Sequence, residues 1–152
     1  MSSSCSALVN SGWEEGNVAE AKILHFDEIK PVARGGGIFT RPLAGSWIGA
    51  DGFTTGVSTS PAGTAITFHS HNVDEAVTLL EGDAICEVGG NSYRLKPWDT
   101  TYIPAGMSHR FMNVGAGPMS ILWVYAGNHV TRTSTETGET VEHMSPGDLG
   151  GR

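Results

Sequence analysis

The chain has little of what marks several large classes of protein. Its 152 residues include only two cysteines, Cys5 and Cys86, which lie far apart; this argues against a disulfide framework and a cysteine-based zinc site. The longest strongly apolar run, ILWVYAG at 121–127, is much shorter than a bilayer-spanning helix. The first sixteen residues contain neither the basic stretch nor the apolar stretch of a secretory signal. These features predict a soluble, cytoplasmic protein with no membrane partner.

Positive charge is scarce and dispersed. Nine lysines and arginines stand against sixteen aspartates and glutamates, for a formal net charge of −7. A nucleic-acid-binding surface needs concentrated positive charge opposite the phosphates. The sequence therefore predicts no nucleic-acid partner and leaves a small molecule as the expected ligand.

Helical periodicity is also scarce, because no segment beyond residue 31 keeps it. Short alternating runs rich in Thr, Val, Ile and aromatic residues are instead separated by turns that use many of the 21 glycines. This spacing is typical of an all-β sandwich or barrel. The predicted strands are 46–50, 53–59, 64–70, 75–80, 84–88, 92–95, 100–103, 108–114, 118–126 and 129–134.

We expect one domain with short extensions. Residues 1–30 would be an N-terminal extension, in which NVAEAKILHFDEI fits either a helical turn or an edge strand. Residues 31–134 would form the barrel. Residues 135–152 would be a C-terminal tail or arm, with a strand extension or an arm across a dimer as the alternatives.

Two of the six histidines are separated by one residue, in the stretch GTAITFHSHNVDEAVTLLEG at 63–82. In a strand, His69 and His71 would point to the same face. A short turn would then bring Glu75 to the head of the next strand, and His109 opens another strand after a Pro/Gly turn. Three imidazoles and one carboxylate can hold a divalent ion with coordination positions left open, as catalytic metal sites do.

The same stretch resembles the first motif of the cupin superfamily, G-x5-H-x-H-x3-E-x6-G. The matching positions are Gly63, His69, His71, Glu75 and Gly82.

The second cupin motif, G-x5-P-x-G-x2-H-x3-N, is matched by Pro104, Gly106, His109 and Asn113. Its first glycine is replaced by Trp98. Because Pro97 presets a type I turn, which needs no positive φ at the next residue, we expect the turn to be rebuilt around Trp98.

The resemblance spans residues 63–113 and implies a single-domain, jelly-roll-like cupin β-barrel. It also implies one divalent transition metal per chain (Fe, Mn, Ni, Cu or Zn), bound by His69, His71, Glu75 and His109, with Glu75 a candidate general base. The expected function is a metal-dependent enzyme on a small anionic or enolic substrate, foremost a dioxygenase. A non-redox lyase, isomerase or cyclase is the alternative, and a binding cupin without catalysis is a third.

Residues that would line the substrate site are predicted from strand parity. Phe111 and Asn113 share the parity of His109, whereas Arg110 should point away. Arg34 and Arg41 are among the cations that could hold a substrate carboxylate, although a solvated surface position is the expected one for each.

Three further inward positions and two isolated histidines complete the predictions. Phe68, Trp123 and Tyr125 are expected to face partly inward with Phe111, and His25 and His143 to be ordinary core histidines. Ile66 and Phe68 would leave an apolar face opposite the histidines, and covering that face would require a homodimer.

Overall fold

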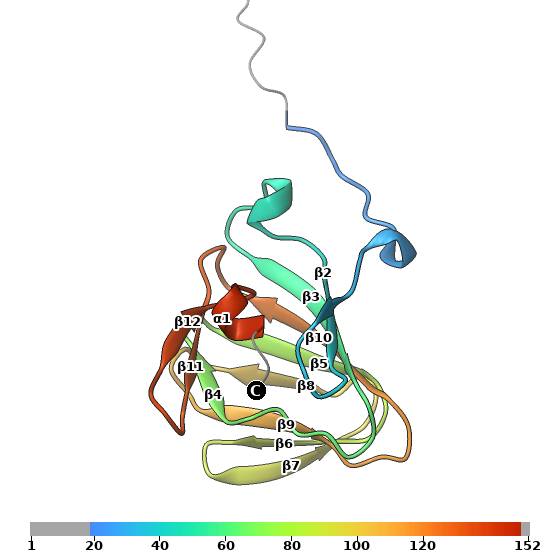
Figure 1. The fold of residues 1–152 in the computed structure, drawn as a ribbon, viewed down its shortest axis with the longest axis vertical. Helices are drawn as coiled ribbons and strands as arrows, with labels where there is room; N and C mark the ends of the chain where they lie inside the picture. The colour runs from blue at the N-terminus through green and yellow to red at the C-terminus, as the bar shows by residue number, and fades with distance from the viewer. Residues whose placement is uncertain (1–18, 150–152) are drawn as a thin grey trace, which may run out of the picture.

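The structure, a computed structural model that describes residues 19–149, consists of two six-stranded antiparallel sheets packed face to face (Figure 1). The all-β jelly-roll-like fold is therefore confirmed. The first sheet has the order β1-β2-β3-β10-β5-β8, and the second β12-β11-β4-β9-β6-β7. The strands of the first are β1 Val32–Ala33, β2 Phe39–Pro42, β3 Thr54–Ser60, β10 Met119–Tyr125, β5 Glu75–Glu81 and β8 Thr100–Ile103. Those of the second are β12 Thr140–Glu142, β11 Thr131–Ser134, β4 His69–His71, β9 His109–Asn113, β6 Ala84–Val88 and β7 Asn91–Leu95.

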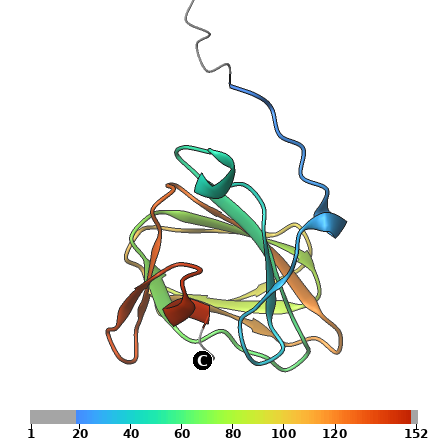
Figure 2. The ribbon, with the colours of Figure 1, turned by 45° about the horizontal axis from the view of Figure 1, so that its top comes forward.

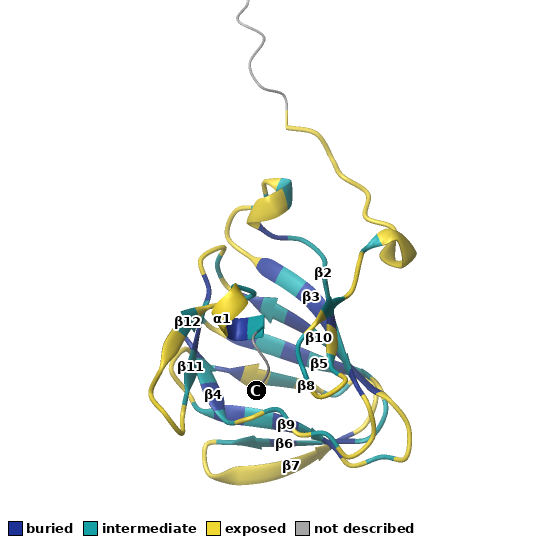
Figure 3. Ribbon diagram, viewed as in Figure 1, coloured by how far each residue is buried: buried dark blue, intermediate teal, exposed yellow. Residues whose placement is uncertain are grey.

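Strand alternation places the core between the sheets. In β5 and β9 every second side chain is buried, as period-two side-chain geometry requires when one face is covered. The buried band runs along the inner strands, while β7 at the sheet edge is mostly exposed (Figure 3). The core cluster includes Val77, Leu79, Phe111, Ile121 and Trp123. The polar site residues lie on the same inward faces.

Two predicted strands differ from the structure. Residues 46–48 form a short 3-10 helix, η2 Ser46–Ile48, which ends at Gly49 in the left-handed conformation that glycine favours. In the predicted strand 64–70 only His69 and Ser70 are part of β4, and residue 65 forms an isolated bridge to Met112. Strict alternation therefore does not hold before His69.

The turn at Trp98 also differs from its prediction. Trp98 has φ 76°, so it adopts the left-handed conformation that glycine favours, and the predicted type I turn is wrong. The Trp98 amide donates to Leu79 O at 2.6 Å, and Asp99 O accepts from the Leu79 amide at 3.0 Å. These two bonds tie the turn to β5 and hold the backbone in the conformation that a glycine would adopt.

Helices within residues 19–149 are few and short. They are η1 Phe26–Glu28, η2 and α1 Pro146–Leu149. None of them is long and apolar enough to cross a membrane. The NVAEAKILHFDEI segment thus contains a single 3-10 turn rather than a strand.

The C-terminal residues form part of the barrel wall. β12 extends the second sheet by pairing with β11, as the strand-extension alternative predicted, and α1 follows directly. Both ribbon views place α1 at one end of the barrel, near β11 and β12 (Figures 1 and 2).

Candidate metal centre and its cavity

Three histidines converge on one point inside the barrel. His69 and His71 lie on β4, and His109 is the first residue of the neighbouring β9, directly paired with His69. All three side chains are buried. One ring nitrogen from each lies within 4.8 Å of the others. Cross-strand pairing thus joins residues 40 positions apart into one ligand set.

Backbone hydrogen bonds orient each imidazole. His69 Nδ1 lies 2.7 Å from Thr67 O, and His71 Nδ1 lies 2.9 Å from Thr131 O. His109 Nδ1 lies 2.9 Å from Met107 O. A carbonyl oxygen can only accept, so each Nδ1 carries the proton and donates it. Each Nε2 is then left with a lone pair, which is the form a metal ligand takes.

Glu75, the first residue of β5, points at this set from the opposite sheet. Its Oε2 lies 2.9 Å from His109 Nε2 and 3.7 Å from His71 Nε2. Oε2 and His109 Nε2 are buried, and neither has a hydrogen-bond partner among residues 19–149. In the tautomer with Nδ1 protonated both facing atoms are acceptors, and a cation bound by both would satisfy them. Three neutral imidazoles and one carboxylate therefore fit a divalent transition metal.

Burial keeps the imidazoles of His69 and His71 neutral. It lowers the pKa of His69 well below the usual value, with the neighbouring charges of His109 and Arg132 acting in the same direction. It also lowers the pKa of His71, although the nearby Glu75 carboxylate opposes this effect. Desolvation penalises the charged imidazolium, so both side chains remain lone-pair donors below neutral pH.

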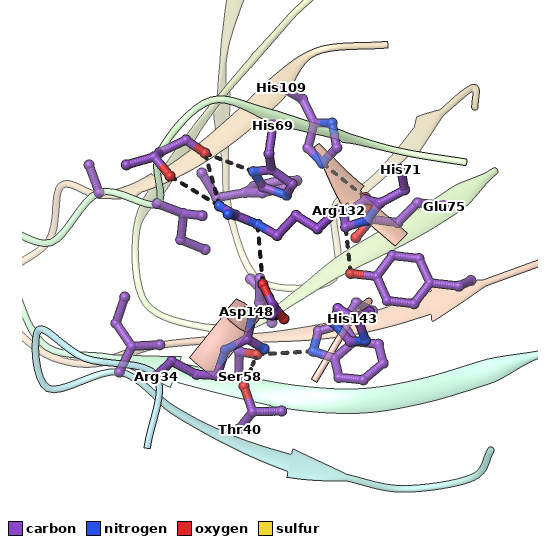
Figure 4. A pocket seen from close by; sticks show the side chains of 18 residues that line it. Arg34, Thr40, Ser58, His69, His71, Glu75, His109, Arg132, His143 and Asp148 are labelled. Carbon is purple, nitrogen blue, oxygen red and sulfur yellow. Dashed lines mark hydrogen bonds and ion pairs between the residues drawn. The ribbon is translucent and has the colours of Figure 1, made fainter. Parts of the chain in front are cut away.

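The ligand set opens into a cavity of about 90 Å³ between the two sheets (Figure 4). One wall is apolar and includes Ile66, Phe111, Ile121, Trp123 and Tyr125. The charged residues in the lining are Glu75, Arg34, Arg132 and Asp148. The cavity combines an aromatic wall with a few converging polar groups, which is typical of small-molecule sites.

Tyr125 and His143 lie beside the histidines. The Tyr125 hydroxyl is 3.3 Å from His71 Nε2, and burial raises the pKa of Tyr125 well above its usual value, so it stays protonated. The His143 ring packs edge-on against Trp123 and Tyr125 at centroid distances of 5.1 and 5.0 Å. Burial, aided by Arg34, lowers the pKa of His143 to about 3, so its ring is neutral at pH 7.

Two arginines and one aspartate line the far side of the cavity. Arg34 Nη2 donates to Asp148 Oδ2 at 2.6 Å, and Arg132 Nε lies 3.9 Å from Asp148 Oδ1. Arg132 Nη2 also donates to Thr67 Oγ1 at 3.0 Å. Figure 4 shows Arg132 between His69 and Asp148.

Only one of the three predicted lining residues faces this cavity. Phe111 lines it, whereas Arg41 and Asn113 lie outside it. Arg41 follows the inward Thr40 on β2 and therefore points outward, where it stacks on Phe26 and donates to Ile29 O. Asn113 is buried at the far end of β9 and bonds the carbonyls of Ser60 and Gly117.

Three other residues with predicted positions, Arg110, Phe68 and His25, are all outside the cavity. Arg110 points outward and pairs with Glu87, as parity predicted. Phe68 does not line the cavity and lies under the Arg110 guanidinium, because the chain before His69 is irregular. His25 is exposed rather than part of a core.

Two of the cavity residues, Arg132 and Asp148, were not predicted from the sequence. Arg34 was predicted as one of the cations that could hold a substrate carboxylate or else lie on a solvated surface, and His143 as an ordinary core histidine. The available signal for Arg132 was its parity with the buried Val130 in a predicted strand, since an inward charged position is unusual. No local pattern marks Asp148.

Comparisons with known proteins agree with this architecture. Residues 56–125 match the family model of the cupin domain. An uncharacterized protein of Methanocaldococcus jannaschii is 32% identical over 63 residues, which are 41% of this chain and 50% of that protein. The chain thus spans about half the length of this curated relative.

Solved structures of the same fold extend over more of the chain. A sugar phosphate isomerase of the cupin superfamily from Silicibacter pomeroyi has a TM-score of 0.67 at 22% identity, covering 80% of this chain and 86% of its own. A predicted oxalate decarboxylase from Thermotoga maritima has a TM-score of 0.61 at 19% identity, covering 70% and 99%. At these identities the likeness concerns the fold. Together with the family-model match over residues 56–125, it shows that this chain has the cupin fold.

Proposed function

We propose that this chain is a metal-dependent enzyme that carries out a non-oxidative reaction, of the lyase, isomerase or cyclase type, on a small organic anion. The observation that carries the proposal is the enclosed set of three oriented imidazoles facing the unpartnered oxygen of Glu75. When bound there, a divalent ion would supply Lewis-acid chemistry by polarising an oxygen of the ligand.

The charge of the cavity supports an anionic ligand. Arg34, Arg132 and a divalent ion would contribute four positive charges, and Glu75 and Asp148 two negative ones. The cavity would keep a net charge of two positive, although the whole chain carries −7. A small acid would therefore be attracted to the cavity and not to the surface in general.

Proton-transfer groups support a non-oxidative reaction. The protonated Tyr125 hydroxyl can donate a hydrogen bond to a ligand oxygen, and the neutral His143 ring beside it can accept one. Glu75 can accept a proton when it is not held by the ion. An isomerase and a predicted decarboxylase are among the structures that share this fold.

Dioxygenase chemistry, the first expectation from the sequence, is the second candidate. The specific observation in its favour is the donor set, because three imidazoles and a carboxylate also suit Fe, Mn, Ni or Cu, which can pass electrons to O₂. A binding cupin without turnover is the third candidate.

The first test is the metal content of the purified protein and two variants. We expect one equivalent of a divalent transition metal in the wild type, and its loss in His109→Ala. His129→Ala is the matched control, since His129 is exposed and paired with Glu142 outside the cavity. A folded His109→Ala that kept a full equivalent would exclude His109 as a ligand.

The second test separates the three candidates. Wild type and Glu75→Gln would be incubated with 2-oxo, 2-hydroxy, enolic and phenolic acids, with product followed by NMR and oxygen by electrode. We expect product without oxygen uptake, and a turnover roughly 10²–10⁴-fold lower in Glu75→Gln, the usual effect of losing a general base. Glu87→Gln, on the outer face, is the control. Oxygen uptake would favour the dioxygenase, and ligand binding without product the binding protein.

A further inference from the structure

Asp148 occupies an unusual place for a carboxylate. Its side chain is fully buried, yet it comes from the four-residue turn α1 near the end of the chain. Oδ2 accepts from Arg34 Nη2 at 2.6 Å and from the Met144 amide at 2.9 Å. Oδ1 is buried and has no hydrogen-bond partner among residues 19–149. The carboxylate is therefore held on one side only.

The unpartnered oxygen faces the second arginine. Arg132 Nε lies 3.9 Å from Oδ1, which is an ion pair but too long for a hydrogen bond. Two guanidinium groups thus flank one carboxylate, and only one of them bonds it well. A carboxylate that was free to move could bond both, because guanidinium groups match carboxylates in geometry.

This arginine pair lies next to the metal centre. In the β11–β4 ladder Arg132 is directly paired with His71, and its guanidinium bonds Thr67, whose carbonyl orients His69. In Figure 4 Arg132 extends from the histidines toward Asp148. A small acid held by the arginines could therefore present a second oxygen to the metal centre.

The segment that carries Asp148 is attached at the edge of the fold. β12 is the outermost strand of its sheet and pairs only with β11 among the described strands. α1 is held by short-range bonds such as Leu149 N to Ser145 O, and by the contacts of Asp148 itself. Withdrawal of Asp148 would break its bonds to Arg34 and to the Met144 amide, whereas the β12–β11 ladder does not involve Asp148.

We propose that Arg34 and Arg132 form the subsite for the carboxylate of the substrate, and that Asp148 occupies this subsite in the ligand-free chain and is displaced by the substrate. The Asp148 carboxylate thus stands in for the acid group of a small organic acid. The inference rests on the proposed function in taking that acid as the substrate, but binding at the arginines does not require turnover.

The test measures binding of malonate, with the neutral malonamide as comparison, by calorimetry on metal-free protein. Asp148→Asn keeps an oxygen for the Met144 amide and removes the competing charge. It should bind malonate about tenfold or more tightly than the wild type, because the wild-type subsite is only partly available. Arg132→Gln introduced into Asp148→Asn should remove this gain, and malonamide should show no difference.

A matched control comes from the exposed Arg94–Asp83 pair, which lies outside the cavity. Asp83→Asn removes an arginine-paired carboxylate without touching the subsite, and should leave malonate affinity as in the wild type. Equal malonate affinity in Asp148→Asn and wild type, or an equal gain in Asp83→Asn, would overturn the inference.

A second measurement uses the wild type, in case Asp148→Asn does not fold. Saturating malonate should speed hydrogen–deuterium exchange of the peptide covering residues 141–149, because the Met144 amide loses its Asp148 acceptor. Unchanged or slower exchange would count against displacement. Repeating the calorimetry on metal-loaded protein keeps the two proposals apart, since a protein without metal or turnover could still show the displacement.

Discussion

At the scale of single residues, the site depends on imidazoles that stay neutral. Because burial lowers the pKa values of His69 and His71, protons should compete with the metal only at lower pH than for free imidazole. Two imidazoles with the ordinary pKa of about 6.5 would together cost roughly 20-fold in apparent affinity at pH 6. We expect a smaller loss in a Co²⁺ titration between pH 8 and pH 6.

The lowered pKa values should move the pH at which metal binding begins to weaken below 6.5, the ordinary pKa of histidine. The sign is that of proton competition: a lower ligand pKa preserves metal binding as the pH falls. The absorption band of bound Co²⁺ reports occupancy directly. A loss of 20-fold or more already at pH 6 would show that the two imidazoles titrate as exposed ones do.

At the scale of elements, the turn at Trp98 contains backbone strain that a substitution could relieve. Trp98 is 75% exposed and has φ 76°, a conformation that costs a non-glycine residue about 1 kcal/mol or more. Trp98→Gly should therefore raise the unfolding temperature, measured by calorimetry. Trp98→Ala is the matched control, since it removes the ring and keeps the positive φ. Equal stability of the two variants would contradict the argument.

At the scale of the whole molecule, the homodimer remains a prediction, but its reason changes. The apolar face of 64–70 needs no partner, because Ile66 packs on the core and Phe68 lies under Arg110. The outer face of the first sheet instead holds a groove lined by Val57, Leu80 and Leu122, among others. A second copy covering this groove would explain why apolar side chains stand on an outer face.

Light scattering of the wild type should thus give twice the 16.0 kDa chain mass at micromolar concentration. Leu122→Glu should give a single chain, because it places a charge in the groove. Tyr93→Glu, on the exposed edge strand β7 of the other sheet, should leave the dimer intact. A wild-type particle of 16.0 kDa would exclude the homodimer.

Sequence reasoning succeeded where local geometry is decisive. The strands around β5, β6, β8 and β9 were predicted within about a residue, since alternation with turn residues on both sides leaves few other structures. It failed where alternation is interrupted, as at residues 64–68 and at η2. It also failed for Trp98, because the bonds to Leu79 override the turn preference of Pro97.

The candidate ligand set could be named from the sequence because its members are fixed by short spacings. His69 and His71 lie two residues apart on one strand, and Glu75 and His109 each open a strand directly after a turn. The far side of the cavity depended on tertiary structure alone. Arg34 and Asp148 are 114 residues apart and meet because the N-terminal strands and the C-terminal turn close over the same end of the barrel. Folding buries most of both side chains, and a buried charge needs an oppositely charged partner. No periodicity along the chain indicates which residues will be buried together.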